Sequence, residues 1–341
     1  MLKIGNILLD DFPVLLAPME DYTDPAFRYL CKKFGADMVY TEFISSEGLI
    51  RNGEKSVKKL DVFDYERPVG IQLYGNVPES MAEATKMAEQ SLPDIIDINL
   101  GCPVKKIAQR GAGAGLLKDI PLMKEIARRV VESTKLPITV KTRLGWDESN
   151  KNIEEIVDHL AETGISAITI HGRTRTQMYK GQADWNLIKK VKEKPGLSIP
   201  VIGNGDIVSP QKAKYCFEHY KVDGIMIGRA AVGKPWIFRD VKQYLKSGKI
   251  PDPPTVKEKS SIAKEHFLRA LEWKEEKRGI FEMRKHFSNY FKGLPNFKEK
   301  RMKLLTSTIK DEIIEILDEI SQTYHDMVIP AYHFWGELEE Y

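Results

Sequence analysis

The sequence predicts an α/β fold, a (β/α)8 TIM barrel followed by a small C-terminal helical bundle. Eight short runs rich in valine and isoleucine alternate with amphipathic stretches, as expected when strands buried on both faces alternate with surface helices. The chain has 341 residues, so a barrel of about 250 residues leaves room for one appended unit. Unusual polar residues follow the ends of several runs, where the active face of such a barrel lies.

The eight runs are the expected barrel strands. They span Val14 to Ala17, Met38 to Thr41, Val69 to Leu73, Ile95 to Asn99, Ile138 to Lys141, Ala167 to His171, Val201 to Gly203 and Gly224 to Ile227. Helices are expected between them, among others over Pro121 to Ser133, Ile153 to Thr163 and Pro210 to His219. Ser209 is expected to cap the last of these, since proline suits the first turn of a helix. A doubly wound open sheet is disfavoured, because no Gly-x-Gly-x-x-Gly turn follows the first strand.

A stretch rich in proline and glycine, residues 247–255, is expected to link two domains. The barrel then occupies residues 1–246 and a helical domain residues 256–341. In the second domain apolar residues recur at spacings of three and four, which predicts helices over Val256 to Lys277, Phe281 to Lys292, Phe297 to Thr308 and Asp311 to Tyr324. Near the end, Tyr332, Phe334 and Trp335 favour docking, whereas the acidic terminus favours fraying.

Composition limits the class of protein. The net charge of +3 is too small to indicate a polyanionic partner by itself. The three cysteines, Cys31, Cys102 and Cys216, are odd in number and widely spaced, which argues against a disulfide framework and for a reducing compartment. No run reaches the roughly 18 apolar residues of a membrane span, and no cysteines or histidines have metal-ligand spacing. We therefore expect a cytoplasmic protein, monomeric when free, with neither a membrane segment nor a metal site.

Cys102 is the leading candidate for chemistry. It follows the fourth predicted strand and lies between Gly101 and Pro103, so it is expected on a tight turn at the mouth of the barrel. A thiol in that position can act as a nucleophile or as an acid. A free cysteine is otherwise a common small core residue, and we favour that interpretation for Cys31 and Cys216.

Cationic and amide residues end the later strands. Lys141 closes the fifth predicted strand, and Arg143 follows two residues later on the same face. An ammonium group at the barrel mouth needs an anionic or carbonyl partner; the alternative is that both residues are solvated loop cations. His171 ends the sixth and could bind a ring carbonyl or a phosphate, or be structural. Asn204-Gly205-Asp206 and Gly228-Arg229 follow the seventh and eighth strands. Barrels commonly bind phosphate at that place, through backbone N–H groups and an arginine.

Taken in order, these motifs resemble those of the tRNA-dihydrouridine synthase family, and most of all its B-type bacterial branch. The similar segments are Ala17 to Met19 with Thr23-Asp24, Asp97 to Pro103, Lys141 to Trp146, His171 to Arg175, Asn204 to Asp206 and Ile227 to Ala231. The resemblance spans essentially the whole barrel. Asp21 stands where the family often has glycine, and Gly111 to Gly115 lacks a serine common there. These departures bear on the local loop geometry and on the substrate preference.

The resemblance implies a flavin-dependent oxidoreductase. The residues it implies for binding FMN are Pro18, Met19, Glu20, Gln72, Lys141, His171, Asn204, Gly205, Asp206, Gly228 and Arg229. NADPH or NADH would reduce the flavin. The implied reaction then reduces the C5–C6 double bond of a uridine in tRNA, with a hydride from flavin N5 to C6 and a proton from Cys102 to C5. Asn99, Lys141, Arg143 and His171 would hold the uracil.

The C-terminal helices contain a cluster of cations that suits an RNA partner. Its members are Lys277, Arg278, Arg284, Lys285, Lys292, Lys298, Lys300, Arg301 and Lys303, opposed only by Glu282 and Glu299. The aromatic residues Phe287, Tyr290, Phe291 and Phe297 lie in the same stretch. They could stack on bases or form a helical core, and the core interpretation is slightly favoured.

Two other functions stay open at this point. An FMN barrel that acts on a free pyrimidine-like metabolite, as dihydroorotate dehydrogenases do, would also use a cysteine or serine at a strand end. The basic C-terminal domain argues against it. A non-catalytic RNA-binding barrel is the second alternative, and it would have no use for Cys102 beside Lys141 and a phosphate-type site.

Overall fold

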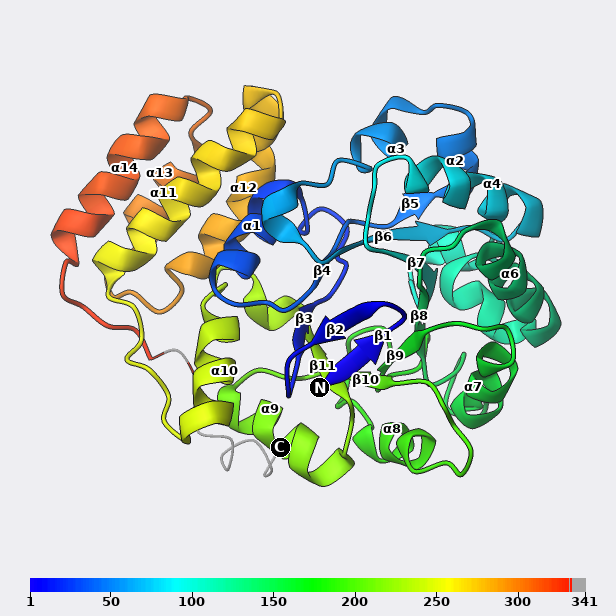
Figure 1. Ribbon diagram of the computed structural model, residues 1–341. Helices are drawn as coiled ribbons and strands as arrows, with labels where there is room; N and C mark the ends of the chain where they lie inside the picture. The colour runs from blue at the N-terminus through cyan, green and yellow to red at the C-terminus, as the bar shows by residue number, and fades with distance from the viewer. Residues whose placement is uncertain (331, 333–341) are drawn as a thin grey trace.

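Eight parallel strands form a barrel in the computed structural model, which describes residues 1–330 and 332 (Figure 1). They run in the order β3, β11, β10, β9, β8, β7, β6, β4, and a bridge between Leu15 and Met38 joins the two end strands. Their bounds are β3 (Val14–Leu16), β4 (Val39–Tyr40), β6 (Val69–Tyr74), β7 (Ile95–Leu100), β8 (Ile138–Arg143), β9 (Ala167–His171), β10 (Val201–Asn204) and β11 (Gly224–Ile227). The predicted TIM barrel is confirmed.

Helices surround the barrel, as alternation along the chain predicts. They are α1 (Pro25–Lys33), α2 (Ser46–Ile50), α3 (Glu54–Lys58), α4 (Pro78–Glu89), α5 (Lys105–Ala108), α6 (Ile120–Ser133), α7 (Ile153–Ala161), α8 (Trp185–Lys192), α9 (Pro210–Tyr220) and α10 (Ile237–Ser247). The predicted cap of α9 is confirmed, because the Ser209 side chain accepts the N–H of Lys212 at 3.2 Å. The three helices expected from the sequence in this part of the chain end within two residues of their predicted bounds.

The amino-terminal end of the barrel is closed by a hairpin that the sequence pattern did not predict. Strands β1 (Leu2–Ile4) and β2 (Ile7–Leu9) pair antiparallel across a tight turn. Leu2, Ile4 and Leu9 are buried in one cluster with the inward-facing residues near the strand starts, such as Ile95 and Ala167. The amino-terminal end of the barrel is therefore filled by apolar side chains. A further short strand, β5 (Ile44–Ser45), pairs with β6.

Four helices after the barrel form a bundle beside α1, yellow to orange in Figure 1. They are α11 (Val256–Trp273), α12 (Glu276–Tyr290), α13 (Lys298–Thr306) and α14 (Lys310–Thr323). The aromatic residues of the cationic stretch belong to the core of this bundle, because Phe287, Tyr290, Phe291 and Phe297 are all buried. They are not available to stack on bases.

One predicted helix is wrong. The apolar spacing predicts a single helix over Val256 to Lys277, but α11 ends at Trp273 and Lys274 has an extended backbone with φ −113° and ψ 154°. The Lys274 side chain is buried against carboxylates, and the chain turns there to begin α12. Of the terminal aromatics, Tyr332 donates its hydroxyl proton to Asp240 at 2.8 Å, while Phe334 and Trp335 lie outside the described residues.

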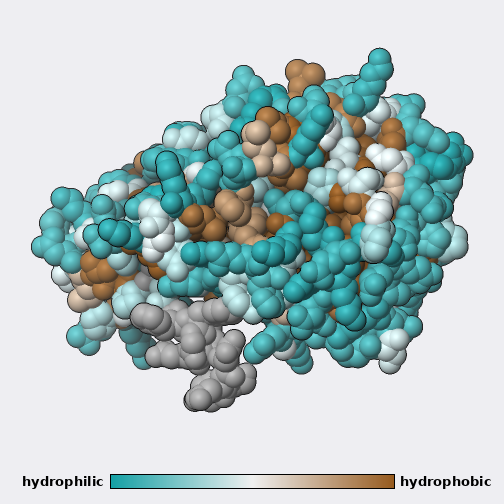
Figure 2. Space-filling model, turned by 60° about the horizontal axis from the view of Figure 1, so that its bottom comes forward, coloured by the Kyte–Doolittle hydropathy of each residue, from teal (hydrophilic) through white to brown (hydrophobic). Residues whose placement is uncertain are grey.

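Hydrophilic residues cover most of the face shown in Figure 2, with hydrophobic residues in small groups between them. Among the described residues, no helix is both long enough and apolar enough to cross a membrane.

Candidate active site

The strand register brings the nominated polar residues together at the carboxyl end of the barrel. Asn99 on β7 lies opposite Lys141 on β8, and Arg143 lies opposite His171 on β9. His171 in turn lies opposite Asn204 on β10. Because successive inward positions of a strand differ by two residues, Lys141 and Arg143 occupy successive inward levels of the same strand. The sequence therefore correctly placed these five residues on one face.

Cys102 is held by a chain of hydrogen bonds that starts inside the barrel. The Asp97 carboxylate accepts from Thr139 Oγ1 at 2.6 Å and from Gln72 Nε2 at 2.6 Å. The Gln72 carbonyl oxygen accepts from Asn99 Nδ2 at 2.9 Å, and Asn99 Oδ1 accepts the backbone N–H of Cys102 at 2.8 Å. These side chains are buried. The turn that presents the thiol is therefore fixed by the rigid strands and not by its own loop alone.

The Cys102 thiol keeps its proton at neutral pH. The residue is 7% exposed, and burial raises the pKa of the thiol, although Arg143 and Lys141 oppose that rise. A protonated thiol can donate a proton but is a poor nucleophile. Cys31 and Cys216 are buried in α1 and α9, consistent with a core role for both.

Lys141 supplies the cationic group of the site. Its Nζ donates to Asn204 Oδ1 at 3.1 Å, and Asn204 is itself anchored because its Nδ2 donates to the Met226 carbonyl at 2.7 Å. Burial, with the nearby Arg143 charge, lowers the pKa of Lys141 to about 8. The ammonium form still predominates at pH 7, so Lys141 can stabilise negative charge that develops beside it.

Arg143 connects two loops at the barrel mouth by hydrogen bonds. Its Nε donates to the Gly101 carbonyl at 2.7 Å, and its Nη1 donates to the carbonyls of Thr174 and Met178, each at 2.9 Å. The residue is 3% exposed. It therefore ties the cysteine turn to the loop after β9. Its Nη2 donates no hydrogen bond to the described part of the chain and can reach a ligand.

His171 is uncharged in this site. Burial lowers the pKa of the imidazole well below its usual range, and the neighbouring cations Arg143, Lys141 and Arg173 add to the effect. A neutral imidazole donates or accepts a single hydrogen bond from each nitrogen. It suits a ring carbonyl or N–H group better than a phosphate.

The ends of β10 and β11 form a cradle of backbone. Gly205 has φ +125°, and a Cβ there would lie 2.7 Å from Ala183 and 3.0 Å from the His171 ring, so only glycine fits. Within residues 1–330, the backbone N–H groups of Gly205, Asp206 and Gly228 donate no hydrogen bond to protein. Backbone N–H groups left free at strand ends are suited to an anion such as a phosphate.

Asp206 and Arg229 differ in what they can offer to a ligand. The Asp206 carboxylate is bound by both Nη atoms of Arg173, at 2.8 and 2.7 Å, and accepts the Ala183 N–H at 2.8 Å, so its backbone N–H is the group it offers to an anion. Arg229 is 56% exposed at the side chain, 3.5 Å from Asp206, and its guanidinium lies 4.7 Å from the centre of the Tyr179 ring. Because its pairing with Asp206 is long and its side chain is exposed, the Arg229 guanidinium is accessible to an anion.

Pro18, Met19 and Glu20 form the loop after β3, at the same end of the barrel. Thr23 Oγ1 accepts the Met19 N–H at 3.0 Å, which closes the loop on itself. Met19 approaches the end of β11, since its sulfur is 3.4 Å from where a Cβ of Gly228 would lie. The exposed Glu20 side chain pairs with Lys59 at 2.5 Å and does not point to a cation in the mouth.

Sequence reasoning did not single out Asp97 and Arg173 as functional. Asp97 alternates with Ile95 and Asn99 along β7, so the period of two was a sufficient signal that it points into the barrel. Arg173 lies within the segment His171 to Arg175 that resembles the family, but its partner Asp206 lies 33 residues further on. No spacing rule predicts such a pair.

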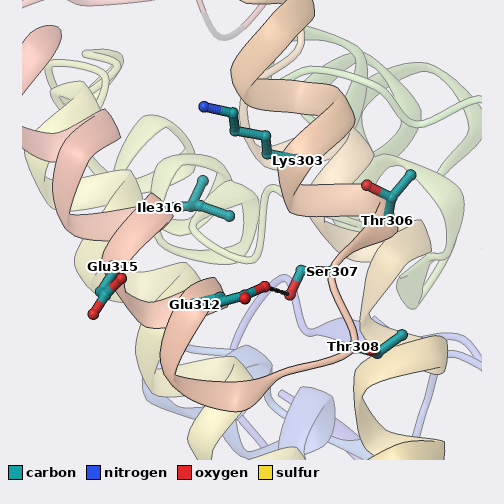
Figure 3. Close-up of a pocket in the computed structure, with 7 residues that line it drawn as sticks. All are labelled: Lys303, Thr306, Ser307, Thr308, Glu312, Glu315 and Ile316. Atoms are coloured by element: carbon teal, nitrogen blue, oxygen red, sulfur yellow. Dashed lines mark hydrogen bonds between the residues drawn. The ribbon is translucent and has the colours of Figure 1, made fainter.

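Two hollows lie on the C-terminal helices, away from the strand ends. One, of about 360 Å³, lies between α13 and α14 and is lined by Lys303, Thr306, Ser307, Thr308, Glu312, Glu315 and Ile316, with Ser307 bonded to Glu312 at 2.8 Å (Figure 3). The other, of about 510 Å³, lies beside the end of α12 and is lined by Ser288, Asn289, Phe291, Lys292, Gly293, Leu294, Phe297, Lys298 and Arg301. The first contains two carboxylates, whereas the second has only cations among its charged residues.

The comparison with protein families decides the classification. The model of the family described as dihydrouridine synthase (Dus) matches residues 15–325. The chain belongs to the dihydrouridine synthase family. It is therefore a flavin-dependent oxidoreductase.

Curated relatives match over nearly their whole length. A probable tRNA-dihydrouridine synthase of Rickettsia conorii is 41% identical over 95% of this chain and 98% of its own. The tRNA-dihydrouridine synthase B of Pseudomonas putida is 40% identical over 88% of each chain. The resemblance to the B-type branch found in the sequence is thus confirmed.

Solved structures share the fold at low sequence identity. Histamine dehydrogenase from Rhizobium sp. 4-9 aligns with a TM-score of 0.54 at 13% identity, over 95% of this chain and 64% of that one. Morphinone reductase aligns with a TM-score of 0.51 at 12% identity, over 74% of this chain and 91% of the other. At such identities the likeness supports the barrel fold alone.

The residues at the mouth fit a flavin of this family. The donor set comprises a lysine ammonium group, a buried amide at Gln72, backbone N–H groups at Gly205, Asp206 and Gly228 that donate to no protein group within residues 1–330, and the exposed cation Arg229. Amide and ammonium donors suit the polar edge of a flavin ring, and the N–H cradle suits a phosphate.

Proposed function

We propose that this protein is a tRNA-dihydrouridine synthase that uses FMN, reduced by NADPH, to reduce the C5–C6 double bond of particular uridines in tRNA. The observation that carries the proposal is the buried, protonated Cys102 thiol, fixed through Asn99 beside the Lys141 ammonium group. The names of the relatives in Rickettsia and Pseudomonas support tRNA as the substrate.

The residues proposed to hold FMN surround the mouth. Gln72 and Lys141 would bind the pyrimidine edge of its ring, Pro18 to Glu20 would line the ring, and Asn204 to Asp206 with Gly228 and Arg229 would bind toward the phosphate. The His171 ring lies 3.0 Å from the point that a Cβ at position 205 would occupy, so it could contact either the cofactor or the substrate. When bound, FMN supplies the hydride that C6 of the uracil receives.

Cys102 completes the reduction. As C6 gains a hydride, C5 gains a proton from the Cys102 thiol, and the resulting thiolate is protonated again from solvent. Asn99, Lys141, Arg143 through Nη2, and neutral His171 are proposed to hold the uracil's carbonyl and N–H groups. Since the Cys102 pKa is raised by burial, the thiol is present in the acid form that this step needs.

The target base must leave its stack to reach the barrel mouth, which costs a few kcal/mol. Contacts elsewhere on the RNA must offset this cost. Of the cationic cluster, Arg278, Lys300 and Lys303 are paired with Glu282, Glu319 and Glu299. Within residues 1–330, Lys292, Lys298 and Arg301 have no carboxylate partner, and all three line the hollow beside α12. We propose that this hollow binds tRNA phosphates.

Charge reversal tests the RNA surface. We expect Lys298→Glu with Arg301→Glu to weaken tRNA binding by about tenfold or more and to flatten its dependence on salt, because each lost phosphate contact removes counterion release. NADPH oxidation in the absence of tRNA should persist. The matched control reverses Lys86 and Lys190, exposed lysines on α4 and α8. Equal tRNA affinity in the two double variants would contradict the assignment.

A reconstitution experiment tests the proposed function. The purified protein is expected to be yellow, to be bleached by NADPH, and to be reoxidised by an unmodified tRNA transcript with formation of dihydrouridine. A colourless protein after addition of FMN would contradict the cofactor assignment. Reoxidation by a free pyrimidine such as orotate, with none by tRNA, would instead favour a dehydrogenase of a small metabolite.

A further inference from the structure

A buried ammonium group links the C-terminal bundle to the barrel mouth. Lys274 lies at the break between α11 and α12 and is 7% exposed. Its Nζ pairs with Asp24 of the barrel and, at 2.5 Å, with Glu282 of α12. Removing a partner from a buried ion pair leaves an uncompensated charge, which is far more costly than losing a surface pair.

Asp24 has two tasks in this contact. Its Oδ1 accepts the Phe27 N–H at 2.9 Å and so caps α1, while its Oδ2 pairs with Lys274. Burial would raise the pKa of Asp24, but Lys274 and the neighbouring histidines His266 and His286 lower it to about 2. The carboxylate is therefore ionised at neutral pH.

Backbone hydrogen bonds connect Asp24 to Met19 at the barrel mouth. Thr23, next to Asp24, makes two hydrogen bonds of 3.0 Å to Met19. Its hydroxyl accepts the Met19 N–H, and its own N–H donates to the Met19 carbonyl. Arg28 fixes the carbonyl of Thr23 at 2.9 Å. Residues 19–24 thus form one closed loop. Its far end is Met19, which approaches Gly228 at the proposed phosphate cradle.

We propose that Lys274 is a positioning residue of the flavin site, which holds the loop Pro18 to Asp24 in its binding geometry through Asp24. The proposal rests on the proposed function, because it takes this loop to face FMN. It gives the C-terminal bundle a role in cofactor binding besides any contact with RNA. Lys274 itself touches no ligand, so its effect must pass through the loop.

Flavin affinity is the test. Apo-protein is titrated with FMN, and binding is followed by quenching of flavin fluorescence and by the visible circular dichroism of the bound ring. Lys274→Met is expected to weaken FMN binding by about tenfold and to alter the dichroism. Lys264→Met is the matched control, because Lys264 on α11 pairs with Asp318 at 2.8 Å on the surface. It should bind FMN as the wild type does.

Asp24→Asn covers the case in which Lys274→Met does not fold. Asparagine still caps the helix, and Lys274 keeps Glu282, so the fold should survive while the link is lost. The same loss of FMN affinity is expected. Wild-type FMN affinity in a folded variant, with only a lower unfolding temperature, would overturn the proposal. Failure of the wild type to bind FMN would instead defeat the proposed function.

Discussion

Cys102→Ala is expected to lower the rate of tRNA reduction by about 10²- to 10⁴-fold, the range for loss of a general acid. Binding of FMN and its reduction by NADPH should persist, because Asn99 holds the backbone N–H of Cys102 and not its sulfur. Single-turnover reoxidation of the reduced protein by tRNA measures the step directly. Serine at this position should also be slow, since a hydroxyl is a much weaker acid than a thiol.

Cys216→Ala is the matched control for this change. Cys216 is equally a buried free thiol, but it lies in α9 on the outside of the barrel. Its loss should leave the rate of reoxidation unchanged. If Cys102→Ala kept the wild-type rate, the proton would have to come from another group, and the proposed role of Cys102 would be wrong.

Arg28→Met is expected to lower the free energy of unfolding by about 3–5 kcal/mol, the cost of stranding a buried charge. Arg28 binds Glu66 through two nitrogens, at 2.6 and 2.9 Å, and the side chains are 2% and 0% exposed. It also donates to the carbonyls of Thr23 and Asp61. Urea unfolding, monitored by circular dichroism, measures the change in the free energy of unfolding.

A second variant separates the stranded charge from the lost packing. Arg28→Met with Glu66→Gln should recover part of the stability, because no buried carboxylate remains unpaired. Arg128→Met is the surface control, since Arg128 pairs with Glu125 and Glu132 on an exposed face of α6. It should unfold as the wild type does. Equal destabilisation by Arg28→Met and Arg128→Met would refute the argument from burial.

The barrel was predictable because parallel strands buried on both faces leave continuous apolar runs in the sequence. Two strands, Ala167–His171 and Gly224–Ile227, match their predicted bounds. Four others extend by one or two residues, for example to Arg143 and Asn204, whereas β3 and β4 are shorter than predicted. The hairpin of β1 and β2 was missed, because strands of three residues give no periodic signal. The break at Lys274 was missed for another reason: its partner Asp24 is 250 residues away.

The candidate site was predictable as far as strand ends are concerned. Asn99, Lys141, His171 and Asn204 each lie at the end of a strand or within two residues of it, and the register of a closed barrel then makes them neighbours. The hydrogen-bond partners of each side chain could not be predicted from the sequence. Arg143 donates three hydrogen bonds to backbone carbonyls, and Asp206 is bound by Arg173. These partners lie on loops whose conformation no sequence pattern predicts.

The most direct test of the proposed activity is the dihydrouridine content of tRNA in cells. Cells lacking this protein are compared with cells in which it is restored, either as the wild type or as Cys102→Ala, and dihydrouridine is mapped by mass spectrometry of purified tRNA. We predict that specific positions lose dihydrouridine, regain it with the wild type and do not regain it with Cys102→Ala. Unchanged dihydrouridine at every position in cells that lack the protein would contradict the proposal.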